Sequence, residues 1–173
     1  MSTALLCTAD GVTRVQGALR DQELDGWLLY EFHGLNPIAV RLLGLGKTTR
    51  RGYVLIPDEE PIALIHAIEA SSWRHWPHAV RTYSGWKDME EQLGALVEGK
   101  TRLAMEVSPG AAVPTLDYVP AGIAGVILNL GVEATSSGDL VSRFHSVWTA
   151  EQRERHGEAA EIVASVAKRA FER

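Results

Sequence analysis

The sequence contains one cysteine, Cys7, and its N-terminus lacks both a basic segment and a long apolar run. A single cysteine cannot form an internal disulfide, which fits a reducing compartment, and the N-terminal pattern excludes a secretory signal peptide. The longest mostly apolar stretch, residues 121–130, is too short to span a bilayer. The net charge of −5 argues against a general attraction to nucleic acid or anionic membranes. These absences predict a cytoplasmic protein with no membrane or nucleic-acid partner.

The sequence also lacks the motifs of well-known catalytic and nucleotide-binding sites. It has neither the Gly-x-Ser-x-Gly turn of many hydrolases nor the Gly-x-Gly-x-x-Gly of dinucleotide-binding proteins. Residues 44–49 read Gly-Leu-Gly-Lys-Thr-Thr, but a phosphate-binding loop needs a glycine where Arg41 stands. Such a loop also follows a strand and precedes a helix, whereas this one is predicted between a helix and a strand. We interpret residues 44–49 as a glycine-rich connection.

Three histidines, His66, His75 and His78, could in principle hold a zinc ion. No cysteine lies near them in the sequence, and no pair of carboxylates has convincing ligand spacing. Together with Trp73 and Trp76, the cluster is more typical of a loop that covers a sheet edge or contacts a partner.

Basic residues gather in a short segment that contains Arg41, Lys47, Arg50 and Arg51. Such a cluster is typical of a solvated surface, but arginine can also recognise a carboxylate because its guanidinium presents a planar fork of donors. The residues alone identify no catalytic group and no metal site in this chain.

Helical and extended patterns alternate along the 173 residues, a length typical of one domain. Strands are predicted at 27–30, 52–56, 61–66, 79–83, 102–107 and 132–134. Helices are predicted at 11–24, 37–43, 86–97, 120–130 and 139–144, with Asp10, Asn36 and Ser84 as caps of the first three. This order, with one hairpin among alternating elements, predicts a single α/β domain with a mixed, mostly covered β-sheet and helices on both faces.

The C-terminal segment is predicted to be a long amphipathic helix. Thr149 and Gln152 have the spacing of a capping box. Apolar side chains then recur at steps of three and four residues, at Ala159, Ile162, Val163, Val166, Ala167, Ala170 and Phe171. No glycine, asparagine or proline ends the helix. We therefore expect one domain over residues 1–148 and a connecting helix over residues 149–173 that leads into a further domain.

Four segments together resemble the N-terminal domain of the creatinase and prolidase (pita-bread) metallopeptidases. Residues 24–29 are similar to the opening strand of that family, and residues 34–44 are similar to its Asn-Ile-x-Tyr-Leu-Thr-Gly segment. Residues 51–57 resemble the next strand, and residues 149–151 resemble the start of the connecting helix. The sequence departs from the family where Arg41 and Leu42 occupy the tyrosine region, and where His145 and Trp148 replace a basic pair.

The resemblance implies a ribonuclease H-like, non-catalytic N-terminal domain of a dimeric Xaa-Pro dipeptidase or aminopeptidase. The family's two divalent metal ions are held by two Asp, one His and two Glu of a C-terminal catalytic domain, so none is expected in this chain, which alone is expected to be inactive. The N-terminal domain supports dimerisation and substrate access in the family, and its loops can reach the partner's active site. By position, the resemblance implies Phe32, His33, Arg50 and Arg51 as contacts for a proline-containing peptide.

Two other functions stay open. The chain could be a stand-alone assembly or binding module with the same fold and no peptidase activity. It could also be a small nuclease related in shape to ribonuclease H, which would need carboxylates clustered on strands to hold metal ions. The predicted strands offer only Glu106 and Glu133 for that chemistry.

Overall fold

The computed structural model describes residues 4–172; residues 1–3 and 173, which belong to the predicted domain and connecting helix, lie outside the described residues. Six strands form one sheet in the order β4-β3-β2-β1-β5-β6. They are β1 (Gly26–Glu31), β2 (Gly52–Ile56), β3 (Ile62–His66), β4 (Ala79–Tyr83), β5 (Arg102–Met105) and β6 (Glu133–Ser136). β2 pairs antiparallel with β1 and with β3, while the other three pairs are parallel. The predicted mixed sheet is confirmed.

Helices connect the strands and continue the chain beyond them. The α-helices are α1 (Ala9–Asp21), α2 (Pro37–Leu43), α3 (Trp86–Val97), α4 (Ala121–Asn129), α5 (Gly138–Phe144) and α6 (Ala150–Phe171). Short 3-10 helices, which the sequence pattern did not predict, are η1 (Leu5–Cys7), η2 (Ala67–Trp73), η3 (Pro109–Ala111) and η4 (Pro114–Leu116). None of the helices within residues 4–172 combines the length and the apolar character needed to cross a membrane.

The strand β1 shows why the sheet is covered on both faces. Its side chains alternate between two cores, and all six residues are buried. Trp27 and Leu29 pack with α1, α2 and α5, whereas Leu28 and Tyr30 pack with α3 and α4. A continuous apolar run is typical of a strand with helices above and below it. The predicted single α/β domain with helices on both faces is confirmed.

Two of the three predicted helix caps are wrong. α1 is capped by Thr8 rather than Asp10, and the Thr8 Oγ1 accepts a hydrogen bond of 3.1 Å from the Gly11 N–H. α3 begins after Gly85 and has no side-chain cap; the Ser84 N–H instead donates to Asp88 Oδ2 at 2.7 Å. The third prediction is confirmed, because the Asn36 Oδ1 accepts from two backbone N–H groups at the start of α2, where Pro37 follows it.

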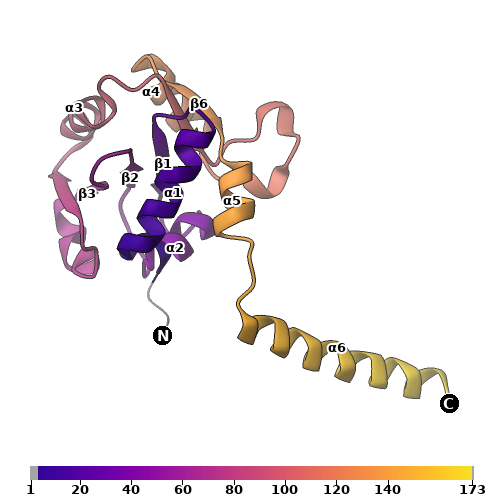
Figure 1. The fold of residues 1–173 in the computed structure, drawn as a ribbon. Coiled ribbons are helices and arrows are strands. Elements are labelled where there is room, and N and C mark those ends of the chain that lie inside the picture. Colours follow the sequence, from indigo (N-terminus) through magenta and orange to yellow (C-terminus); the bar gives the residue numbers. More distant parts are fainter. Residues whose placement is uncertain (1–3, 173) are drawn as a thin grey trace.

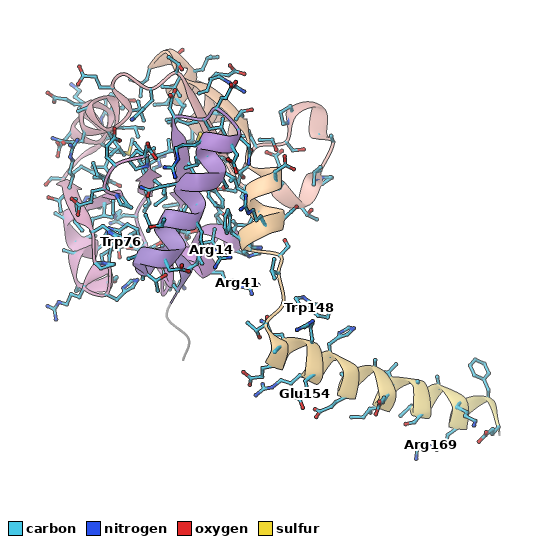
Figure 2. The ribbon with its side chains drawn as sticks, viewed as in Figure 1. Arg14, Arg41, Trp76, Trp148, Glu154 and Arg169 are labelled. Carbon is cyan, nitrogen blue, oxygen red and sulfur yellow. The ribbon has the colours of Figure 1, made fainter. Side chains whose placement is uncertain are left out.

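The last helix, α6, leads away from the rest of the chain (Figure 1). Its predicted capping box at Thr149 and Gln152 is confirmed. None of its residues is buried, and the apolar side chains of Ile162, Val163 and Phe171 are 64%, 68% and 92% exposed. Figure 2 shows Trp148 at the junction, where its ring lies 4.5 Å from that of His156. α6 is therefore an amphipathic helix whose apolar side is uncovered in this chain.

Candidate functional site: a cleft at the ends of four strands

A cleft of about 390 Å³ lies at the edge of the sheet where β1, β3 and β4 end and β2 begins. The register of the strands brings these ends together, because Glu31 of β1 pairs with Gly52 of β2, and His66 of β3 pairs with Tyr83 of β4. All four site residues that the resemblance implied line this one cleft. The lining residues are Phe32, His33, Thr49, Arg50, Arg51, His66, Tyr83, Gly85, Trp86 and Met89.

Aromatic rings form much of the wall. The rings of Phe32 and His33 lie 4.3 Å apart between centroids, and those of His66 and Tyr83 lie 5.1 Å apart in an edge-to-face arrangement. The indole of Trp86 adds an apolar surface that is 62% exposed to solvent. Such rings offer a flat surface against which a small apolar group can pack.

His33 stands at a sharp turn of the cleft's rim. Its backbone φ angle of 60° lies in the left-handed region, which is uncommon for residues other than glycine, and the next residue is Gly34 with φ 75°. Residues in this conformation persist where the surrounding structure holds them, and they are found often at binding sites. The surroundings of Phe32 and His33 must therefore hold this rim of the cleft in its conformation.

The second rim supplies the positive charge. Arg50 and Arg51 are exposed, and within residues 4–172 no carboxylate lies within 4.0 Å of either guanidinium. The Arg50 side chain donates to the Thr49 carbonyl at 3.1 Å, and the Arg51 carbonyl accepts a 2.7 Å bond from the Tyr83 hydroxyl. Burial raises the pKa of Tyr83 to about 12, although the Arg51 charge acts in the opposite direction. The tyrosine is thus neutral at physiological pH, and the two arginines give the cleft its charge.

This arrangement is suited to binding a carboxylate that carries an apolar group. Two guanidinium groups can hold a carboxylate through paired hydrogen bonds, while the neighbouring rings can contact an apolar group attached to it. Among the described residues 4–172, no group of three histidine, cysteine or acidic side chains could hold a metal ion.

The histidine cluster of the sequence is divided between different roles. His66 lines the cleft, where its Nδ1 accepts from the Ile68 N–H at 3.2 Å. His75 Nε2 lies 2.9 Å from the Leu43 carbonyl oxygen, and His78 Nε2 lies 3.1 Å from that of Leu6. These two rings join the loop after η2 to α2 and η1. Trp73 and Trp76 are buried in the core on the α1 side of the sheet, so they cover a face of the sheet rather than an edge.

The basic cluster of the sequence is also divided. Arg50 and Arg51 lie in the cleft, whereas Arg41 lines a separate hollow together with Arg14 and Trp148. Figure 2 shows these three side chains near the junction with α6. The glycine-rich connection that contains Lys47 runs from α2 into β2, as predicted, and its first residue, Gly44, has φ 65° at the end of α2.

Three buried glutamates support this edge of the sheet, and the sequence analysis did not identify them as a group. They are Glu31, Glu69 and Glu106, with exposed fractions of 2%, 7% and 0%. Glu31 and Glu69 contact the two rims of the cleft. The sequence indicates Glu106 only as a candidate metal ligand of a nuclease.

Glu106 directly follows β5, and its carboxylate accepts three hydrogen bonds. The donors are the Trp27 Nε1 at 2.7 Å, the Asn36 Nδ2 at 2.8 Å and the Ser137 hydroxyl at 3.1 Å. Burial raises the pKa of Glu106 to about 7, although these hydrogen bonds act to lower it. Glu133, by contrast, is exposed at the start of β6, beside Arg102 at 3.8 Å. The two glutamates follow or begin strands at opposite ends of the β5–β6 pair, so they do not form the carboxylate cluster that a nuclease would need.

The fold is similar to those of solved prolidase structures. The prolidase from Pyrococcus horikoshii OT3 matches with a TM-score of 0.62 and 18% identity over 94% of this chain and 42% of that chain. The dipeptidase PepE from Mycobacterium ulcerans matches with a TM-score of 0.68 and 17% identity over 98% of this chain and 44% of that chain. The creatinase/prolidase N-terminal domain of an X-PRO dipeptidase from Streptococcus pyogenes gives a TM-score of 0.60 and 11% identity over 78% of this chain and 98% of that chain.

These similarities confirm the fold that the resemblance implied, the creatinase/prolidase N-terminal fold followed by a long helix. The chain spans less than half the length of the Pyrococcus prolidase and of the Mycobacterium dipeptidase. The sequence matches no protein-family model and has no significant match among curated proteins.

Proposed function

We propose that this chain is the non-catalytic N-terminal domain of a cytoplasmic Xaa-Pro metallopeptidase. In this proposal α6 connects it to a C-terminal catalytic domain, which carries two divalent metal ions and hydrolyses the peptide bond next to proline. The structural neighbours named as prolidases and as an X-PRO dipeptidase support this assignment. The uncovered apolar side of α6 is consistent with a helix that packs against such a domain.

The cleft at the ends of the strands is the observation that carries the proposed role. It combines Arg50 and Arg51, whose guanidinium groups are free of acidic partners among the described residues, with the rings of Phe32 and His33. We assign the arginines to the terminal carboxylate of a short proline-containing peptide and the rings to its apolar part. In a homodimer this cleft would face the active site of the other subunit and limit the length of the peptide that enters.

A second candidate is a stand-alone binding module with the same fold. The observation that favours it is that two arginines and several aromatic rings gather in one cleft, which suits the binding of a carboxylate without a catalytic step. The coding sequence beyond Arg173 discriminates between the two: continuation into Asp, His and Glu metal ligands supports the peptidase, and a stop codon supports the module.

Calorimetric titration of the chain with the dipeptide Ala-Pro tests the role of the cleft. We expect Arg50→Ala and Arg51→Ala each to weaken binding about tenfold or more, because each removes a charged donor to the carboxylate. Blocking the peptide's carboxylate as an amide has the same expected effect. The matched control is Arg74→Ala, which removes an exposed arginine outside the cleft. Equal affinity of the wild type for the dipeptide and its amide would contradict the assignment.

A further inference from the structure

Two neighbouring threonines in the connection from α2 to β2 contact two different buried glutamates. The Thr48 hydroxyl donates to the Glu31 Oε1 at 3.4 Å. The Thr49 backbone N–H and hydroxyl both donate to the Glu69 Oε1, at 2.7 Å and 2.6 Å. The segment that continues into Arg50 and Arg51 is therefore hydrogen-bonded to two different parts of the fold, the end of β1 and η2.

Glu31 also holds the opposite rim of the cleft. Its carboxylate accepts from the Gly34 N–H and, at 3.1 Å, from the Asn36 N–H. These two bonds close the turn that carries Phe32 and His33 and retain His33 in its left-handed conformation. One buried carboxylate thus contacts both the aromatic rim and, through Thr48, the basic rim.

Glu69 acts on the basic rim from η2. Burial acts to raise the pKa of this carboxyl, but the bonds from Thr49 and the nearby positive charge outweigh it, so the pKa is lowered. Glu69 binds Thr49 through its Oε1, and it forms no ion pair within 4.0 Å with any basic side chain of residues 4–172. The arginines next to it remain available to a ligand.

We infer that Glu31 and Glu69 are positioning residues of the cleft, which fix the two loops that present Phe32 and His33 opposite Arg50 and Arg51. This inference rests on the proposed carboxylate-binding function. In it, two acids that do not line the cleft hold the loops of the cleft in place. Rims that are fixed before binding reduce the conformational entropy lost when a small ligand is held.

Glu69→Ala tests the inference, with Glu60→Ala as the matched control because Glu60 is an exposed acid in the turn between β2 and β3. We expect Glu69→Ala to weaken Ala-Pro binding about tenfold or more, and Glu60→Ala to leave it unchanged. Thr49→Val removes one of the two bonds to Glu69 and should weaken binding about threefold. Glu69→Gln keeps an acceptor oxygen and should restore most of the affinity.

Thermal unfolding and amide hydrogen exchange separate positioning from a merely structural role. If Glu69→Ala or Thr49→Val lowers the melting temperature but leaves the affinity of the folded protein unchanged, the inference is overturned. If Glu69→Ala does not fold, Thr49→Val and Glu69→Gln decide the question by the same comparison.

The amide of Thr49 gives a result even if Ala-Pro does not bind. Absence of binding to the wild type would remove the proposed function. The inference would then stand only if Glu69→Ala speeds the exchange of the Thr49 amide about tenfold or more relative to Glu60→Ala, since that amide donates to Glu69. Unchanged exchange would overturn it independently.

Discussion

The body of the chain, residues 4–148, and the helix α6 use apolar residues in opposite ways. In β1 and β2 every residue is buried, whereas in α6 none is. Both patterns could be recognised in the sequence. For the buried strands the sequence also indicates what covers them, because helices predicted within the same chain can lie on both faces of the sheet. For α6, the apolar pattern predicts that a helix forms, but it does not identify the surface that the helix packs against.

The polar contacts of the two regions differ in the same way. The body contains buried hydrogen bonds between residues far apart in sequence, such as that from Trp27 to Glu106 across 79 positions. α6 has local ion pairs between exposed side chains, such as Arg155 with Glu151 at 2.7 Å. Exposed pairs of this kind contribute little to stability. We therefore expect the body to unfold as one cooperative unit and α6 to respond only to local changes.

The largest expected effect is the loss of the buried carboxylate in the body. Glu106→Ala leaves three donors without an acceptor, so the free energy of unfolding should fall by about 4 kcal/mol. Urea unfolding followed by tryptophan fluorescence measures it. The matched control is Glu133→Ala at an exposed position of β6, with an expected change below about 0.5 kcal/mol. Similar midpoints for the two variants would contradict the role assigned to the buried network.

The next effect is a pH dependence that belongs to the body alone. The pKa of Glu106 is raised from 4.5 to about 7 in the folded state, so its stabilising contribution is complete below pH 4.5 and is lost as the pH rises through 7. The wild type should lose up to about 3 kcal/mol of unfolding free energy over that interval. Glu106→Gln, which does not titrate, should lack this slope, and the difference between the two urea series isolates it. Parallel profiles for the two proteins would contradict the prediction.

The smallest effect comes from replacing a helix-capping threonine by alanine, once in the body and once at α6. Thr8→Ala removes the cap of α1 and should lower the free energy of unfolding of the body by about 1 kcal/mol. Thr149→Ala removes the capping box of α6 and should reduce the far-ultraviolet helical signal without moving the unfolding midpoint of the body. A shared shift in midpoint would show that α6 unfolds together with the body.

The sequence predicted the strands well because the deciding information is local. The buried run in β1 and the order Asn36-Pro37 at the start of α2 identify these elements without knowledge of the fold. The failed cap at Asp10 has a tertiary cause. The buried side chain of Leu6 fixes η1, which leaves Thr8 extended and places Gly11 so close to the Leu5 carbonyl that a side chain there would clash.

The site could be predicted only in part for a related reason. Phe32, His33, Arg50 and Arg51 follow from the loop positions implied by the resemblance, and strand register then brings the two loops to one edge. The glutamates that hold these loops, Glu31 and Glu69, could not be predicted, since an acidic residue is normally solvated and the sequence pattern does not mark one that is buried. The donors to the third buried glutamate, Glu106, lie 79, 70 and 31 positions away, so only the folded chain brings them together.

Asn36 connects two of the three buried glutamates, because its backbone N–H donates to Glu31 while its side-chain amide donates to Glu106. Asparagine residues age chiefly by deamidation, in which the backbone nitrogen of the next residue attacks the side-chain amide and closes a five-membered ring. The next residue here is Pro37, whose nitrogen carries no hydrogen, so that ring closure is blocked. Asn36, whose backbone bonds to one buried acid and whose side chain bonds to another, is thus chemically protected from conversion into a third acid.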